Sequence, residues 1–162
     1  NDDLSPTQKG TLVHGFLEHL PLNEQPAKQT IDSLYQKGLY DDQELAVLYD
    51  YLDKINTFKH SQVFKLMLES DQVWKEKSFS LLDETTSQVV HGIFDVVCFK
   101  DQQITIIDYK TDRVKKDTKE YYLKENHRIQ MEYYKQLLQR VYPDYSIQAI
   151  VYYLEIGKYV IV

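Results

Sequence analysis

The sequence predicts an α+β (mixed α/β) fold in a single domain over residues 1–162. Two observations predict it. Apolar residues recur at helical spacing through residues 1–70, and residues 71–162 contain β-branched and aromatic segments typical of strands, interrupted by one long helical stretch at about 118–142. The length is that of one ordinary domain, and no repeat or linker divides the chain, so we expect the helices and the sheet to form one unit.

The N-terminal region is predicted to contain four helices. The first begins at Ser5-Pro6, where Gln8 completes a capping-box pattern, and it ends before Pro21. The second covers about 27–37 and ends at Gly38, because glycine is common directly after a helix. A third is expected from about 42 to 55, and a short fourth from about 61 to 69.

The rest of the chain is predicted to contain five strands and one helix. Strands are expected at about 73–82, 89–99 and 104–109. The long helix ends before Pro143, and two further strands, near 147–155 and 159–162, are joined at Gly157.

Composition excludes several classes of site. The single cysteine, Cys98, excludes an intrachain disulfide and a cysteine-held zinc or iron–sulfur site within this chain. No apolar run reaches the ~20 residues of a membrane span and no signal peptide opens the sequence, so we expect no membrane partner and a cytoplasmic location. Because the chain starts with Asn1 rather than Met, we expect it to be part of a longer polypeptide.

Charge is unevenly distributed along the chain. The net charge of −6 argues weakly against nucleic-acid binding, but residues 110–128 carry seven basic and four acidic side chains. A solvated helix face is one interpretation of this segment. Its position directly after the candidate site favours the other, a surface for nucleic acid.

Two acidic residues and a lysine lie within the apolar strands. Asp108 and Lys110 share a face, since side chains alternate along a strand. If the turn at Asp101-Gln102 is symmetric, Asp95 lies directly opposite Asp108, with Cβ atoms roughly 4.5–5.5 Å apart. Two carboxylates at that distance repel unless a hard divalent cation such as Mg²⁺ compensates.

Such a cation would polarise a phosphate and activate a water, and Lys110 could stabilise the charge that develops. The carbonyl of Tyr109 is a candidate further ligand. The alternative is a surface salt-bridge network. The apolar flanks of both strands favour the metal site, because charges within such runs are costly unless they are compensated.

Two helices offer further candidates. Gln130 and Tyr134 are spaced i, i+4 and could grip phosphate oxygens or the lysine, or they could be polar tips of a half-buried face. His14 and Glu18 have the same spacing on the first helix. His14 could be a metal ligand or a hydrogen-bonded core histidine.

Taken together, four motifs resemble the RecB-like branch of the PD-(D/E)XK nucleases. They are Gly10-Thr-Leu-Val-His14-Gly-Phe-Leu-Glu18, Gly92-Ile-Phe-Asp95, Asp108-Tyr-Lys110-Thr-Asp112 and Gln130-Met-Glu-Tyr-Tyr134. Within that branch the chain is most similar to the C-terminal nuclease domains of the AddA (RexA) family of helicase–nucleases. One cysteine argues against the AddB type of nuclease domain, which holds an iron–sulfur cluster.

The resemblance implies a fold, a site and partners. The fold would be a PD-(D/E)XK restriction-endonuclease-like core, a mixed sheet flanked by helices. His14, Asp95, Asp108 and the Tyr109 carbonyl would bind Mg²⁺, for which Mn²⁺ could substitute. Lys110 would be the catalytic lysine, with Gln130 and Tyr134 as the family's Q-x-x-x-Y motif.

The implied activity is that of an exonuclease acting on unwound single-stranded DNA during repair of double-strand breaks. The partners would be the helicase region of the same polypeptide and an AddB/RexB-type subunit. No G-x-x-x-x-G-K-[ST] motif occurs, so this chain lacks that route to ATP hydrolysis. Two alternatives stay open: a non-catalytic DNA-binding or subunit-docking module that retains the fold, and a stand-alone exonuclease of the same superfamily.

Overall fold

The computed structural model describes residues 3–162, which form six helices and a five-stranded sheet. In chain order the elements are α1 Pro6–His19, α2 Ala27–Gln36, α3 Asp42–Asp50, α4 Leu52–Lys59, α5 Gln62–Glu69, β1 Gln72–Asp83, β2 Gln88–Lys100, β3 Gln103–Lys110, α6 Glu120–Val141, β4 Ser146–Tyr153 and β5 Lys158–Ile161. The predicted order of helices, three strands, a helix and two strands is confirmed.

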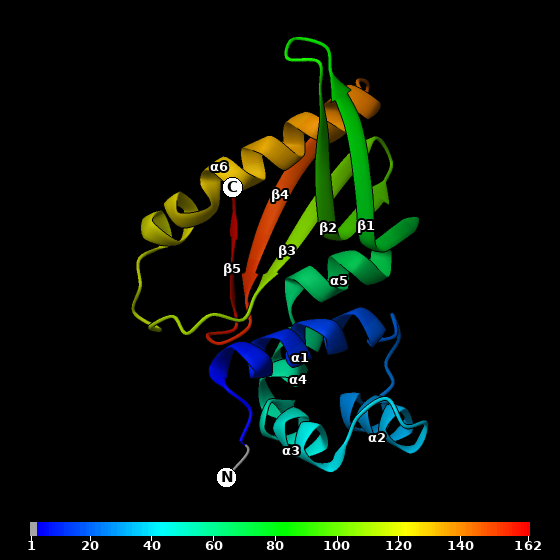
Figure 1. Cartoon of the computed structure of the whole chain (residues 1–162), viewed down its shortest axis with the longest axis vertical. Helices are drawn as coiled ribbons and strands as arrows, with labels where there is room; N and C mark the ends of the chain where they lie inside the picture. The colour runs from blue at the N-terminus through cyan, green and yellow to red at the C-terminus, as the bar shows by residue number, and fades with distance from the viewer. Residues whose placement is uncertain (1–2) are drawn as a thin grey trace.

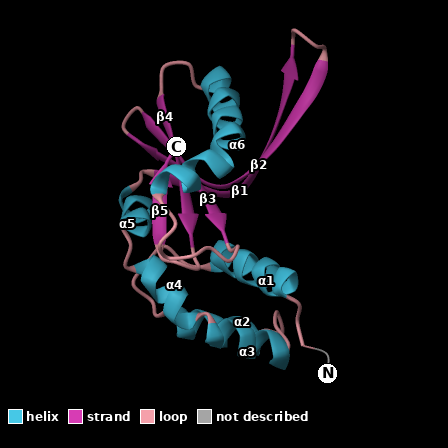
Figure 2. Ribbon diagram, turned by 90° about the vertical axis from the view of Figure 1, so that its left-hand side faces the viewer, coloured by secondary structure: helices cyan, strands magenta, loops and turns pink. Residues whose placement is uncertain are grey.

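The sheet is mixed, as the resemblance implies. Its strand order is β1-β2-β3-β4-β5; β3 and β4 are parallel and the other neighbours are antiparallel. A parallel pair needs a crossover connection, and α6 provides it. Helices α1 to α4 gather beyond one end of the sheet, while α6 lies along one of its faces (Figure 1). Turned by 90°, the view shows α6 and α5 on opposite sides of the sheet (Figure 2).

Each face of the sheet has its own core. Along β3, Ile107 and Tyr109 face the N-terminal helices, whereas Ile104 and Ile106 face α6. Cys98 is buried in the core shared with the N-terminal helices. This alternation matters for the site, because Asp108 and Lys110 fall on the α6 face by the same period of two.

The predicted start of α1 is confirmed in detail. Ser5 Oγ accepts a hydrogen bond from the backbone N–H of Gln8, and Gln8 Oε1 accepts one from the backbone N–H of Ser5, which completes the capping box. The end of α2 is also as expected, since Gly38 follows it with a φ of 83°.

The expected single helix over about 42–55 is wrong, because the chain forms two helices there. α3 ends at Asp50 and α4 begins at Leu52, with Tyr51 between them at φ −89° and ψ −1°. The break lets Leu48 of α3 and Ile55 of α4 both reach the core, where neither is exposed. Tyr51 is neither glycine nor proline, so the sequence carries no local signal for the break.

The predicted pairing of β2 with β3 is confirmed. Five pairs form, from Lys100 opposite Gln103 to Val96 opposite Ile107, around a turn in which Asp101 adopts a φ of 53°. Beyond β3, strands β1 and β2 continue as a two-stranded ribbon that projects from the body of the sheet (Figure 1). Among residues 3–162 no helix is long and apolar enough to cross a membrane.

Candidate active site

The two acidic residues lie where β3 separates from β2. Val96 opposite Ile107 is the last ladder pair, and Asp95 and Asp108 come next along the strands. Instead of a further ladder bond, Asp95 Oδ2 accepts the backbone N–H of Tyr109 at 2.9 Å. That hydrogen bond fixes the carboxylate of Asp95 against the end of β3.

Asp108 is the most deeply placed acidic group of the site, at 6% exposure. Lys110 Nζ lies 2.9 Å from Asp108 Oδ2, yet this buried oxygen has no hydrogen-bond partner, so the ammonium approaches from a direction poor for hydrogen bonding. Burial, and then the charge of Asp95, raise the pKa of Asp108 to about 6. The neighbouring carboxyl groups are close enough to share a hydrogen bond while Asp108 holds a proton.

His14 reaches the pair from α1. Its Nε2 lies 3.1 Å from Asp95 Oδ1, and this hydrogen bond is the main reason why the pKa of His14 is raised. Burial alone would raise the pKa of Asp95, but the hydrogen bond and charge of His14 and the N–H of Tyr109 outweigh it, so the pKa of Asp95 is lowered. The structure therefore brings His14 to Asp95 rather than leaving it in the core.

Lys110 is also held from the opposite side, by α6. Lys110 Nζ donates to Gln130 Oε1 at 3.3 Å, and Gln130 Nε2 donates to the hydroxyl of Tyr134 at 3.3 Å. The ring of Tyr134 packs on Phe94 with centroids 4.9 Å apart. Asp108, Lys110, Gln130 and Tyr134 thus form one continuous chain of contacts.

Gly92, the glycine of the Gly-Ile-Phe-Asp segment, allows α6 to approach the sheet. A Cβ atom at this position would lie 3.1 Å from Leu137 Cδ1 and 3.7 Å from Tyr134 Cε1. A larger residue would therefore push against the helix that carries Gln130. The glycine is needed for close packing at this point, because its φ is not positive.

Tyr109 contributes its backbone to the site, while its side chain belongs to the core. The ring packs edge-on against Phe58, with centroids 5.4 Å apart, and is 6.0 Å from the ring of His14. Its hydroxyl contacts Met67 Sδ at 3.8 Å. The role of the Tyr109 carbonyl as a ligand stays a prediction.

Sequence reasoning missed Glu76. It lies across from Asp95 in β1, at the one position where the pairing of β1 with β2 skips a residue, and its φ is 48°. Burial and a hydrogen bond with Glu76 raise the pKa of Glu18 to about 7. Glu18 is also 3.8 Å from His14 Nδ1, so a second carboxyl pair adjoins the first.

The side chains fit a hard divalent cation. The fit rests on Asp108 Oδ2, a buried carboxylate oxygen without a hydrogen-bond partner beside a second carboxylate. Among residues 3–162 no three His, Cys, Asp or Glu side chains are already arranged around one point. Mg²⁺ does not require such a cage, because it is usually held through one or two carboxylates, waters and substrate phosphates.

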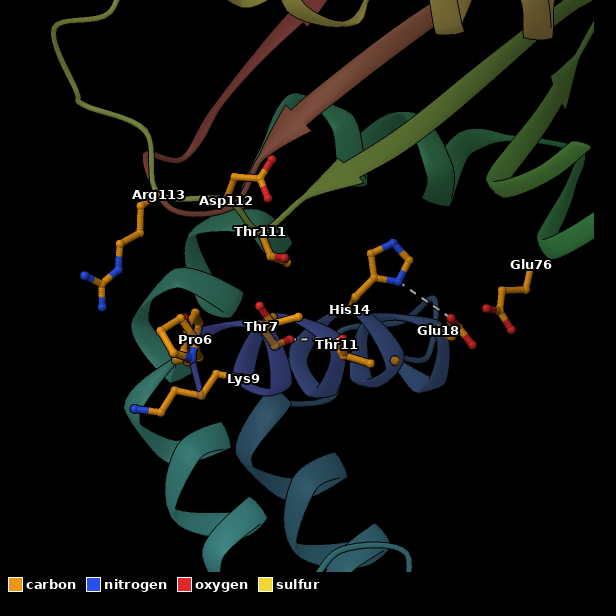
Figure 3. Close-up of a pocket in the computed structure, with 13 residues that line it drawn as sticks. Pro6, Thr7, Lys9, Thr11, His14, Glu18, Glu76, Thr111, Asp112 and Arg113 are labelled. Atoms are coloured by element: carbon orange, nitrogen blue, oxygen red, sulfur yellow. Dashed lines mark hydrogen bonds and ion pairs between the residues drawn. The ribbon is translucent and has the colours of Figure 1, made fainter. Parts of the chain in front are cut away.

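A cavity of about 730 Å³ opens beside His14, between α1 and the loop that follows β3. Figure 3 shows His14, Thr11 and Thr7 along α1, with Thr111 of the loop above them and Glu18 and Glu76 at one end. Of the candidate site residues, His14 lines this cavity, so the cavity reaches the site at His14.

Comparison with known proteins agrees with this geometry. Residues 1–160 match the family model described as the PD-(D/E)XK nuclease superfamily. The chain belongs to the PD-(D/E)XK nuclease superfamily. The members of the superfamily are nucleases. That assignment agrees with the mixed sheet, the paired carboxylates and the lysine described above.

Similar curated proteins come from helicase–nucleases. The chain is 27% identical over 175 residues to the A subunit of the ATP-dependent helicase/nuclease of Clostridium botulinum (strain Loch Maree / Type A3), covering 97% of this chain and 13% of that protein. It is 26% identical over 168 residues to the protein of the same name in Staphylococcus carnosus (strain TM300), covering 91% of this chain and 14% of that protein. This PD-(D/E)XK chain therefore spans only about an eighth of the length of the relatives it matches, and its resemblance to the A subunits of helicase–nucleases is confirmed.

Proposed function

We propose that the chain is the metal-dependent deoxyribonuclease domain of a cytoplasmic helicase–nuclease, where it acts as an exonuclease on unwound single-stranded DNA at double-strand breaks. One observation carries the proposal above all: a buried carboxylate oxygen of Asp108 without a hydrogen-bond partner, with Lys110 Nζ 2.9 Å away. The names of the relatives support the helicase–nuclease setting. The proposed partners are a helicase region of the same polypeptide and an AddB/RexB-type subunit.

Asp95 and Asp108 would hold the cation, Mg²⁺ or Mn²⁺, with His14 and the carbonyl of Tyr109. When bound there, a divalent cation polarises a phosphate and lowers the pKa of a water molecule. Lys110 places a positive charge beside the carboxylates, where it stabilises the negative charge that grows on the phosphate oxygens during attack. Gln130 and Tyr134 hold that ammonium in place before the substrate arrives.

The proposal is tested by cleavage of a labelled single-stranded oligonucleotide with Mg²⁺, Mn²⁺ or EDTA. The wild-type chain should cleave only with metal, and Asp108→Asn and Lys110→Gln should each lose activity by at least ~100-fold. Asp117→Asn is the matched control, because Asp117 is exposed.

Cleavage by Asp108→Asn at the wild-type rate would refute the assignment. Metal-independent binding of DNA without turnover at any metal concentration would instead support a binding or docking module.

A further inference from the structure

The cavity along α1 has two ends of opposite charge. At one end lie Glu18 and Glu76, next to His14. At the other end lie Lys9 and Arg113, which Figure 3 shows on the side away from the glutamates. Hydroxyl-bearing residues line the stretch between the ends: Thr7, Thr11 and Thr111.

Lys9 and Arg113 are available to a ligand. Within residues 3–162 neither side chain has a carboxylate within ion-pair distance or a hydrogen-bond partner, whereas Lys124 and Arg128, in the same basic stretch of sequence as Arg113, bind glutamates on α6. Those two cations therefore belong to a solvated helix face. Among the basic residues of the segment, Arg113 is the one that lines the cavity.

The N-terminal end of α1 adds to the positive potential at this end of the cavity. α1 is 14 residues long, and its first turn, beside Lys9, contains no acidic residue to offset the positive end of the helix dipole. Asp112 also lines the cavity, but Figure 3 shows its carboxylate directed away from α1. The cationic end thus combines two free side chains with a helix start whose first turn contains no acidic residue.

The distance from this end to the candidate active site suits a nucleic-acid strand. Lys9 and His14 are five residues apart on α1, which corresponds to ~7.5 Å along the helix axis. A stacked strand advances ~3.4 Å per nucleotide, so the spacing spans about two nucleotides. Glu18 and Glu76 disfavour a phosphate on the opposite side of His14.

We propose that Lys9 and Arg113 form a binding site for a backbone phosphate of the substrate strand, about two nucleotides from the bond that is cut. The inference rests on the proposed nuclease function, which makes the ligand a nucleic-acid strand, but binding at this site can be measured without cleavage. The ligand is a phosphodiester anion, and the hydroxyls of Thr7 and Thr111 are donors for its neighbouring oxygens, whereas the hydroxyl of Thr11 already donates to the carbonyl oxygen of Thr7.

The test measures binding of a fluorescent 12-nucleotide oligo-dT by anisotropy, with Ca²⁺ present and salt varied from 50 to 200 mM. Each phosphate contact contributes ~0.7 to the slope of log affinity against log salt for a single strand. Because the proposed site holds one phosphate, the double variant Lys9→Gln/Arg113→Gln should lower the magnitude of that slope by about 0.7, and weaken binding by roughly tenfold at the lower salt. Lys37→Gln, at the end of α2 and outside the cavity, should bind as the wild type does.

Two further measurements separate folding from binding and binding from catalysis. Lys9→Arg keeps the positive charge and should keep the wild-type slope, and equal melting temperatures should show that the glutamine variants fold. In Mg²⁺, the ratio of kcat/KM for the oligonucleotide to that for bis(p-nitrophenyl) phosphate, which has a single phosphate, should fall in the double variant.

An unchanged slope and affinity in the double variant would overturn this inference while leaving the nuclease proposal intact. Failure of the wild type to bind the oligonucleotide would overturn it as well. Salt-dependent binding through Lys9 and Arg113 without cleavage in any metal would overturn the nuclease proposal and leave the phosphate site standing.

Discussion

Replacing Asp108 by asparagine should stabilise the protein in the absence of metal, even though it removes a catalytic group. The pKa of Asp108 is raised from the ordinary 3.8 to about 6, by burial and by Asp95. Each pKa unit corresponds to about 1.4 kcal/mol, so ionising Asp108 in the folded state costs about 3 kcal/mol at most. Asparagine resembles the protonated acid and avoids this cost at every pH.

The effect should depend on pH in one direction. Because the pKa of Asp108 is higher in the folded chain than in the unfolded chain, the stability that its proton provides is complete below about pH 4 and is lost as the pH rises through about 6. Asp108→Asn should therefore exceed the wild type by only about 1 kcal/mol near pH 4.5 and by about 3 kcal/mol at pH 8. For a chain of this size that corresponds to a rise in melting temperature of roughly 5–10 °C.

The assay is thermal and urea denaturation followed by circular dichroism, in EDTA, at pH 4.5 and pH 8. Asp117→Asn makes the same chemical change at an exposed position and should show no such pH-dependent gain. If Asp108→Asn is no more stable than the wild type at pH 8, or if its advantage is equal at both pH values, the carboxylates do not repel each other as described.

Three further predictions concern metal, packing and the lysine. Mn²⁺ at about 100 times its dissociation constant should stabilise the wild type by about 2.7 kcal/mol and leave Asp108→Asn nearly unchanged in thermal denaturation; equal shifts in both would place the ion elsewhere. Gly15→Ala should stabilise the chain by up to ~1 kcal/mol, because an added Cβ meets nothing within 4 Å. Gly10→Ala should stabilise it less, because the added Cβ would lie 2.9 Å from Thr111 Oγ1. Equal gains in the free energy of unfolding by urea denaturation would argue against this contact. Gln130→Ala should lower kcat by about tenfold with little change in KM, because it removes the hydrogen bond that holds the ammonium of Lys110. Steady-state kinetics would measure this, with Gln29→Ala as the control at an exposed position. A rise in KM without a fall in kcat would contradict the prediction.

Much of the fold could be predicted because its signals are local. The capping box at Ser5 and the glycine after α2 mark helix ends directly, and the β-branched runs mark the strands. The two-residue turn at Asp101 fixed the register of β2 against β3 by counting alone. That register was sufficient to place Asp95 and Asp108 together at the end of the ladder.

The parts that could not be predicted depend on tertiary packing or on longer turns. Tyr51 gives no sign that a helix ends, because the break is set by how α3 and α4 pack. Residues 84–87 join β1 to β2 without a glycine or an Asn-Gly pair, so the position of Glu76 opposite Asp95 could not be counted from the turn. The contact of Gln130 with Lys110 follows from where α6 crosses the sheet, which no local pattern specifies.

A crystal of the chain soaked in Mn²⁺ would examine the carboxylate pair most directly. An anomalous peak should appear in bonding contact with carboxylate oxygens of both Asp95 and Asp108, and it should be absent from crystals of Asp108→Asn. A peak bound elsewhere, or none at a Mn²⁺ concentration that supports cleavage in solution, would contradict the assignment of these two residues as the centre of a metal-dependent nuclease.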